Sequence, residues 1–371
     1  MSRFCDAVGM RWLTAVLSLS SLCTLPVAAA GRKPVVVENV SVWEEPGRFG
    51  GWPANHGIWS WGDEILVGFS AAYFKLGDLD RHLVDRTRPG VAGLARSLDG
   101  GRTWKFTQFA SEPGGSPMEL TEPMDFTHPD FALKLQATNA DNGPARFYYS
   151  TDRGHHWRGP YKFPMFDLKG VPARTDYIVN GQRDCLLFLT ASKSNGKEGR
   201  PFCARTRDGG LTWKFVSYIG PEPEGFAIMP STVRLSPATL LTTIRHKEAS
   251  GNWLDAYLST DDGANWRLLG KVAPTGEKSG NPPSLLRLRD GRLAVVYGYR
   301  AAPYGIRARF SSDNGKSWSG DFMIRADGAW WDLGYPRSVQ RPDGKIVSVY
   351  YFMRAKDTER YIAATIWDPG E

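Results

Sequence analysis

Polar and aromatic side chains that can do chemistry lie at a repeating distance from a recurring turn with the pattern Ser/Thr-x-Asp-x-Gly-x-x-Trp. Tyr177, Pro230 and Pro282 each lie 29 residues before such a turn, and Pro336 follows 54 residues after Pro282. Two further prolines extend the series with altered spacing, and these are Pro53 and Pro129. If each opens an inner strand of a radial repeat, the residues just before them form a ring at one mouth of a central funnel. The predicted ring is Trp52, His128, Asp176, Met229, Asn281 and Tyr335.

Two carboxylates at one mouth can act as general acid and general base on a glycosidic bond. Asp176 belongs to the ring and Asp130 follows His128 by two positions, so these aspartates form one candidate pair, with His128 and Arg174 beside them. The turn His128-Pro-Asp130 is a weak metal-ligand set without a second histidine or a cysteine pair. We therefore expect no metal and no cofactor.

A second set of residues lies 15 positions after the strand-opening prolines. Arg245, Tyr297 and Tyr351 have this spacing, and Arg300 and Arg354 come three residues further on. The strand that follows each inner strand returns to the same mouth, so the predicted funnel is polar, aromatic and cationic. Such a lining suits an anionic ligand.

The turns that position these strands share the pattern Ser/Thr-x-Asp-x-Gly-x-x-Trp. Five copies begin at residues 97, 150, 206, 259 and 311, which are 53, 56, 53 and 52 residues apart. In each copy the Asp carboxylate can accept backbone N–H groups, Gly supplies a positive φ, and Trp can wedge between neighbouring units. We interpret the five boxes as structural staples of a repeat with one supersecondary unit per copy.

Short β-type runs separated by Gly, Asp and Pro turns fill the spaces between boxes, and about four strands fit one period, which is the size of a propeller blade. Residues 335–367 supply about three more strands without a box, and the run 35–42 can close the ring. The sequence predicts an all-β, six-bladed β-propeller over residues 31–371, with an insertion at 71–90 that covers one mouth.

Residues 1–30 read as a signal peptide, with Arg3 and Arg11, an apolar run, and a small-residue cleavage site near Ala30. This predicts a secreted or periplasmic protein with no membrane span in the mature chain. The formal charge of +7 comes from scattered basic residues, which suits an anionic partner without indicating nucleic acid. Cys185 and Cys203 can either pair or remain free thiols. We expect a monomer.

With these boxes and phrases such as Arg174-Thr-Asp-Tyr and Gly334-Tyr-Pro-Arg, the chain resembles the sialidase superfamily of BNR or Asp-box proteins, especially secreted bacterial exo-α-sialidase-like proteins. The resemblance covers nearly all of the mature chain. It implies a tyrosine nucleophile, because the substrate carboxylate would repel an anionic one. The phrase Gly334-Tyr335, followed by Arg341-Pro-Asp-Gly344, matches the family position of this tyrosine.

The resemblance also implies three arginines that hold the substrate carboxylate bidentately. Arg245 matches the second arginine, and Arg300 or Arg307 lies in the region of the third. The first arginine has no match in Gly50-Gly-Trp-Pro53. Arg48 is close but displaced, and Arg337 can substitute from the neighbouring blade.

The resemblance also implies two carboxyl groups, and for each of them the sequence offers more than one candidate. The glutamate that assists the tyrosine should stand at Met229, and Glu224 and Asp332 are the nearby candidates. For the acid/base aspartate Asp85 fits best, with Asp78 and Asp80 as rivals, and an acid there would need a raised pKa. Trp52 and Asn281 from the ring are expected to contact substrate.

These residues predict an exo-acting glycosidase for terminal sialic acid or a related acidic sugar of glycoconjugates. One alternative is a propeller glycosidase or lyase with another sugar substrate, which would use the funnel Asp and His residues. A non-catalytic carbohydrate-binding propeller is the other alternative.

Overall fold

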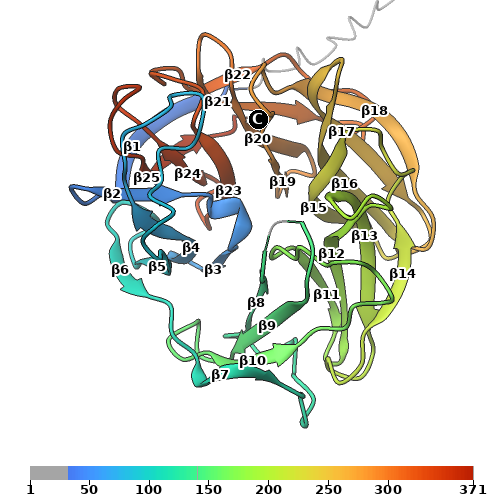
Figure 1. Ribbon diagram of the computed structural model, residues 1–371. Helices are drawn as coiled ribbons and strands as arrows, with labels where there is room; N and C mark the ends of the chain where they lie inside the picture. Colours follow the sequence, from blue (N-terminus) through green and yellow to red (C-terminus); the bar gives the residue numbers. More distant parts are fainter. Residues whose placement is uncertain (1–31, 140, 371) are drawn as a thin grey trace, which may run out of the picture. The chain divides into compact units, whose positions relative to one another are not determined.

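Six β-sheets surround a central axis in the computed structural model, which describes residues 32–139 and 141–370 (Figure 1). No α-helix occurs in these residues, so the predicted all-β, six-bladed propeller is confirmed. In this part of the chain no helix is long and apolar enough to cross a membrane. The predicted signal peptide at 1–30 lies outside the described residues.

The predicted closing strand pairs in the last blade. Blade 6 consists of β23 (Gly334–Gln340), β24 (Ile346–Phe352), β25 (Tyr361–Asp368) and β1 (Val35–Trp43), in the order β1-β25-β24-β23. Because β1 pairs antiparallel with β25, the N-terminal strand completes the blade that the C-terminal strands begin.

Blades 3, 4 and 5 each have four strands in simple order, with the first strand nearest the axis. Blade 3 is β11 (Tyr177–Gly181), β12 (Asp184–Ser192), β13 (Glu198–Thr206) and β14 (Lys214–Tyr218). Blade 4 is β15 (Phe226–Ser236), β16 (Thr239–Glu248), β17 (Gly251–Ser259) and β18 (Arg267–Pro274). Blade 5 is β19 (Pro283–Arg287), β20 (Leu293–Tyr299), β21 (Gly305–Ser311) and β22 (Phe322–Arg325).

The five boxes act as the staples that their residue types predict. Each box joins the third and fourth strands of its blade, and its Ser or Thr hydroxyl accepts the N–H of the box glycine, as in the 2.8 Å bond from Gly315 to Ser311. The Asp carboxylate accepts a backbone N–H four residues on, as in the 2.9 Å bond from Ser317 to Asp313. We call the end of the ring with the boxes the box end, and the opposite end the mouth.

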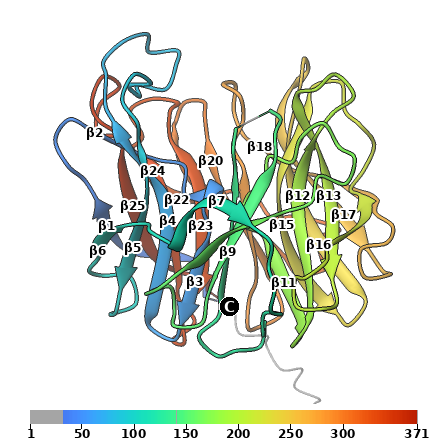
Figure 2. The ribbon, with the colours of Figure 1, turned by 60° about the horizontal axis from the view of Figure 1, so that its bottom comes forward.

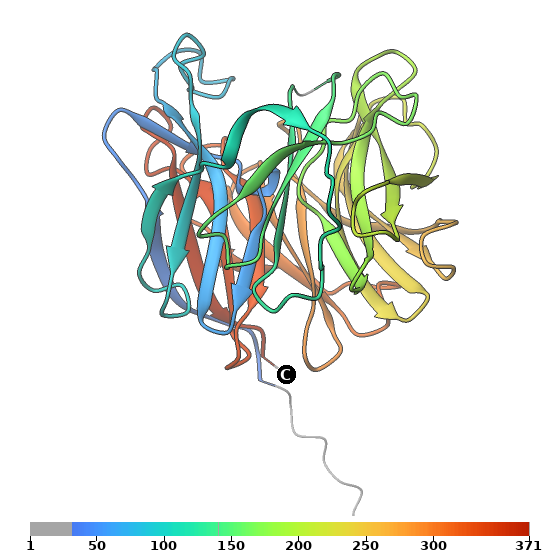
Figure 3. The ribbon, with the colours of Figure 1, turned by 90° about the horizontal axis from the view of Figure 1, so that it is seen from below.

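Blade 1 departs from the simple pattern because its first strand is interrupted. It consists of β2 (Arg48–Gly51), β3 (Ile58–Trp61), β4 (Glu64–Tyr73), β5 (Val91–Ser97) and β6 (Lys105–Gln108). Both β2 and β3 pair with β4, and the 3₁₀ turn η1 (Pro53–Asn55) lies between them. Between β4 and β5, residues 74–90 form the expected insertion, which stands beyond the strand ends at the mouth (Figures 2 and 3).

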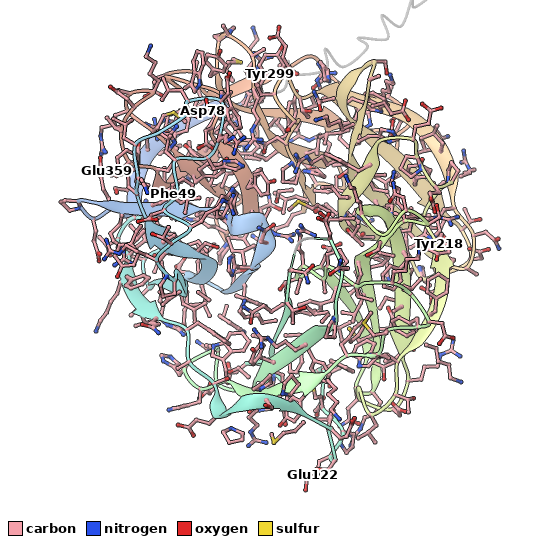
Figure 4. All side chains as sticks on the ribbon, in the orientation of Figure 1. Phe49, Asp78, Glu122, Tyr218, Tyr299 and Glu359 are labelled. Atoms are coloured by element: carbon pink, nitrogen blue, oxygen red, sulfur yellow. The ribbon has the colours of Figure 1, made fainter. Side chains whose placement is uncertain are left out.

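Blade 2 lacks the innermost strand that the repeat predicts. Its order is β7 (Glu112–Met118), β10 (Arg158–Lys162), β9 (Ala145–Ser150) and β8 (Ala132–Ala137). Since its box follows β9, that strand is the third of the blade and β8 is the second. The segment before β8 runs along the box end of blade 3, where Met124 N–H donates to the carbonyl of Gly209 at 2.8 Å. In the same segment, Glu122 lies at the periphery of the ring (Figure 4).

The interruption of blade 1 fills the centre of the ring. The Ala54 carbonyl accepts a hydrogen bond from Arg337 of blade 6 at 3.0 Å. The His56 carbonyl accepts one from Thr175, just before blade 3, at 2.7 Å. Residues 52–57 therefore form a plug that connects blades 1, 3 and 6. Lys134 of β8 is buried against this plug, with its Nζ 3.4 Å from the Nδ1 of His56.

Candidate functional site

Three of the six predicted ring positions share an uncommon backbone conformation. Trp52, Met229 and Tyr335 have φ values of 55°, 57° and 50°, and each directly precedes a proline. Bulky residues rarely adopt a positive φ, and such strain persists only where the surroundings impose it. At Tyr335 the backbone is held by Asn281, whose Oδ1 accepts the backbone N–H of Tyr335 at 2.8 Å. The predicted ring positions of blades 1, 4 and 6 are therefore equivalent in the structure.

The Tyr335 side chain lies among three guanidinium groups at the mouth. Arg245 donates to its phenol oxygen at 2.7 Å, and the carbon centres of Arg245 and Arg300 lie 5.5 and 5.4 Å from its ring. Burial alone would raise the pKa of this phenol. The charges of Arg245, Arg300 and Arg174 outweigh burial, so the pKa of Tyr335 lies below its ordinary value.

Within the part of the chain that the structure describes, no carboxylate forms an ion pair with Arg245 or Arg300. The Nε of Arg245 donates to the carbonyl of Ser279 at 3.1 Å, and the Nε of Arg300 donates to the carbonyl of Leu333 at 3.1 Å. The Nη2 of Arg300 also donates to the hydroxyl of Tyr351 at 2.6 Å. Their charges are thus not cancelled by their hydrogen-bond partners, which gives the surroundings of Tyr335 a positive potential.

Glu198 is a candidate that the sequence reasoning missed. It begins β13 at the hairpin of blade 3, and its carboxylate forms a two-point contact with Arg174, with Nη2 to Oε2 at 3.2 Å. Burial raises the pKa of Glu198 above its ordinary value, against the opposing charges of Arg174 and Arg245. A carboxyl group of this kind can hold a proton nearer to neutral pH than an exposed one.

Asp176 lies deeper in the funnel, at a small cavity of about 10 Å³, enough for about one water molecule. The cavity is also lined by Arg174 and Arg337, and the buried atoms Asp176 Oδ2 and Arg337 Nε have no partner there. Burial raises the pKa of Asp176 to about 7, although Arg337 opposes the shift. Arg337 itself donates to the carbonyls of Ala54 and Thr175, so it anchors the plug.

The predicted carboxylate pair of Asp130 and Asp176 is wrong, because Asp130 and His128 lie at the box end. Asp130 forms an ion pair of 2.6 Å with Arg153, a residue of the second box. Within its own turn, His128 Nδ1 accepts the backbone N–H of Asp130 at 3.2 Å. The alignment failed here because blade 2 has no first strand, so the residues before β8 do not reach the mouth.

Three predicted carboxyl roles also need correction. Asp85 accepts two hydrogen bonds from Thr87 in a local turn, which lower its pKa rather than raise it. The Glu224 side chain is exposed, and its carbonyl is held by Lys193 at 2.9 Å.

Asp332 is fully buried, and His82 of the insertion is 2.6 Å from it. Burial would raise the pKa of Asp332, but His82, Arg360 and Arg300 together lower it.

The remaining candidates lie at or below the mouth. Asn281 is fully buried and binds backbone groups, so it positions Tyr335 instead of contacting a substrate. Arg307 is paired with Asp321 at 2.6 Å. The half-buried ring of Trp52 packs edge-on against His82, with centroids 5.2 Å apart. Arg48 donates to the carbonyl of Ala72 at 2.9 Å, beside the same insertion.

Two further features bear on the chemistry. Cys185 and Cys203 are free, buried thiols. Within residues 32–139 and 141–370, no group of three His, Cys, Asp or Glu side chains is arranged to hold a metal ion.

Residues 133–348 match the family model of the BNR repeat-like domain. The sequence matches no curated protein. Among solved structures, a protein of unknown function from Dyadobacter fermentans is 21% identical with a TM-score of 0.71, over 90% of this chain and 99% of that one.

Two glycosidases are similar in structure at lower identity. The α-L-arabinofuranosidase Arb93A from Fusarium graminearum is 12% identical with a TM-score of 0.61, over 89% of this chain and 97% of that one. The NanB sialidase from Streptococcus pneumoniae is 12% identical with a TM-score of 0.58, over 94% of this chain and 72% of that one. At these identities the likeness shows a shared fold, and it does not transfer an activity.

Proposed function

The chain belongs to the BNR repeat-like family, and from that premise we propose that it is a glycoside hydrolase that removes a terminal acidic sugar, such as sialic acid, from glycoconjugates. One observation carries the proposal. The Tyr335 phenol accepts a hydrogen bond from Arg245 and is surrounded by Arg245, Arg300 and Arg174, which lower its pKa. A phenol activated in this way can attack an anomeric carbon that bears a carboxylate.

In the proposed reaction Tyr335 attacks as its phenolate, which the surrounding arginines favour, and its oxygen bonds to the anomeric carbon while the glycosidic C–O bond breaks. Glu198, whose pKa is raised above its ordinary value by burial, gives its proton to the departing oxygen. A water molecule then attacks the anomeric carbon and gives a proton to Glu198, and the Tyr335 phenolate is released. Two displacements at one carbon retain its configuration.

The positive potential near Tyr335 would attract the carboxylate of an acidic sugar. Arg245 and Arg300 are buried and donate to carbonyl and hydroxyl oxygens, so they would attract a substrate carboxylate through their positive charge. The fold likeness to the NanB sialidase is in keeping with such a substrate.

A second candidate is a glycosidase for a neutral sugar, such as an arabinofuranoside, that uses Glu198 and Asp176 as a carboxyl pair. The observation that favours it is that both carboxyl groups have raised pKa values and both adjoin Arg174. The fold likeness to Arb93A is in keeping with this candidate.

The test is release of 4-methylumbelliferone from its α-sialoside and its α-L-arabinofuranoside. Sialoside turnover that is lost in Tyr335→Phe and kept in Tyr218→Phe, a tyrosine of the outer strand β14, would support the first proposal. Arabinofuranoside turnover that survives Tyr335→Phe but not Glu198→Gln would support the second. If the folded protein binds sugars but cleaves neither compound, both enzymatic proposals fail and a carbohydrate-binding propeller remains.

Secretion is part of the proposal, on the basis of the signal-like residues 1–30. The mass of the chain recovered outside the cytoplasm tests it. We expect loss of about the first 30 residues, and recovery of a full-length chain inside the cell would contradict secretion.

A further inference from the structure

The insertion of blade 1 forms one wall of a pocket that the proposed mechanism does not use. The pocket has a volume of about 650 Å³, within the usual range for ligand sites. Residues 75–78 and 80–87 line one side, and Ser279 and Trp331 line the other. Asp78 of this insertion is labelled in Figure 4.

This wall is fixed to blades 5 and 6 at three points. His82 contacts the buried carboxylate of Asp332 at 2.6 Å. The carbonyl of Leu79 accepts hydrogen bonds from both indoles of Trp330 and Trp331, at 3.0 and 2.9 Å. Asp80 forms an ion pair of 2.7 Å with Lys278 of the segment before β19. The Asp332 carboxylate is buried and the Asp80–Lys278 pair is exposed, and together with the Leu79 carbonyl these contacts give the pocket a preformed wall.

The opposite wall is shared with the candidate site. The carbonyl of Ser279 accepts the hydrogen bond from Arg245, which in turn donates to Tyr335. The ring of Trp331 lies 5.2 Å from the guanidinium of Arg300. The pocket therefore adjoins the place where the bond would be cleaved.

The lining combines apolar side chains with charges of both signs. Leu76 is exposed and Val84 is half-buried, while Leu83 and Trp331 also line the pocket but are almost fully buried. The charged side chains of the insertion that line the pocket are Lys75, Asp78, Asp80, Arg81, Asp85 and Arg86. Such a surface suits a neutral group with many hydroxyls, because each hydroxyl can donate to a carboxylate or accept from a cation while C–H faces contact the apolar side chains.

We propose that this pocket is a subsite for the neutral sugars of the leaving group, so that the preferred substrate is an oligosaccharide. The inference rests on the proposed glycosidase function. It predicts that the insertion determines which leaving group is preferred, while Tyr335 and the arginines determine which terminal sugar is bound.

The test compares two substrates with the same terminal sugar, namely the 4-methylumbelliferyl sialoside and a sialyllactose. The variant Lys75→Ala/Arg86→Ala removes two pocket cations, and Arg102→Ala/Lys105→Ala is the matched control at the box end. We expect the ratio of kcat/KM for sialyllactose over the aryl sialoside to fall about fivefold or more in the pocket variant only. An unchanged ratio would overturn the subsite.

Binding separates failure of the subsite from failure of the proposed function. Lactose alone is titrated against the wild-type protein and the pocket variant by saturation-transfer NMR. Binding by the wild type that weakens in the pocket variant supports the subsite even if no substrate is cleaved. Equal binding by both proteins, or none by the wild type, overturns it, whereas aryl sialoside turnover would still uphold the function.

Discussion

The guanidinium of Arg245 donates a 2.7 Å hydrogen bond to the phenol oxygen of Tyr335, which is 90 residues away in the chain. The two residues come from blades 4 and 6, and the backbone of Tyr335 is held by Asn281, which lies just before β19 of blade 5. The candidate centre therefore depends on the correct closure of three blades, which links the stability of the ring to the geometry of the site.

Replacing Tyr335 by Phe should abolish turnover while leaving ligand binding in place. The phenol oxygen is the proposed nucleophile, and the ring itself fills the same space in both residues. We expect kcat to fall by about three orders of magnitude. Steady-state kinetics, with binding of a sialic acid measured separately, checks this. A Tyr335→Phe protein with more than a tenth of the wild-type kcat would remove tyrosine from the mechanism.

Glu198→Gln should remove the alkaline limb of the pH–rate profile along with most of the activity. If Glu198 acts as the acid, its protonated form is needed, so activity is present below its folded pKa and is lost as the pH rises through that value. Because burial raises this pKa, the loss falls at a higher pH than for an exposed glutamate. The measurement is kcat/KM against pH, using an aryl substrate with a good leaving group so that the variant retains measurable turnover.

An unchanged alkaline limb in Glu198→Gln would assign the acid role to another group. Asp176, with a pKa of about 7, is the next carboxyl to examine, and Asp176→Asn is the corresponding variant.

The ring of blades is predictable from the boxes, because a staple of Ser, Asp, Gly and Trp needs only its own eight residues and repeats in phase. The mouth positions of Met229 and Tyr335 are predictable for the same reason, since blades 4 to 6 keep a nearly constant length. Blade 2 departs from this length, so the spacing places His128 at the wrong end of the ring. No local sequence pattern predicts that blade 2 lacks its first strand, or that residues 52–57 form a plug at the centre of the ring.

Glu198 could not be predicted because its role depends on a long-range contact. In the sequence it ends a polar turn, Ser194-Asn-Gly-Lys-Glu198, and reads as a surface residue. Only the hairpin of blade 3 brings it against Arg174. The one usable signal is topological, because hairpins between second and third strands all reach the mouth. Asp332 is the opposite case, since its burial under His82 makes it an anchor of the insertion.

Asn281→Leu should disturb Tyr335 without touching a substrate. The Asn281 Oδ1 accepts the N–H groups of Tyr335 at 2.8 Å and Gly298 at 3.3 Å, and its Nδ2 donates to the Leu333 carbonyl. Leucine leaves these buried groups unpaired, which costs roughly 1–3 kcal/mol of unfolding free energy. We expect kcat to fall more than KM rises. Asn281→Asp keeps the acceptor and should recover part of kcat, whereas equal loss in both variants would reduce Asn281 to a packing role.

Lys134→Met should stabilise the protein at neutral pH. Lys134 is buried against His56 and the ring of Phe109, and burial, assisted by Arg146, lowers its pKa to about 7. The unfolded chain holds its proton up to about pH 10.5. The native state therefore carries a penalty that is full below about pH 7 and fades as the pH rises toward 10.5, and it amounts to about 5 kcal/mol at most.

The gain in Tm of Lys134→Met should accordingly be largest at pH 6–7 and shrink by pH 9–10. Lys105→Met, on an exposed position of β6, is the matched control and should change Tm little at either pH. Differential scanning calorimetry over this pH range gives the answer. A Lys134→Met protein that is less stable at pH 7 would mean that the lysine makes a favourable interaction in the gap left by the missing strand of blade 2.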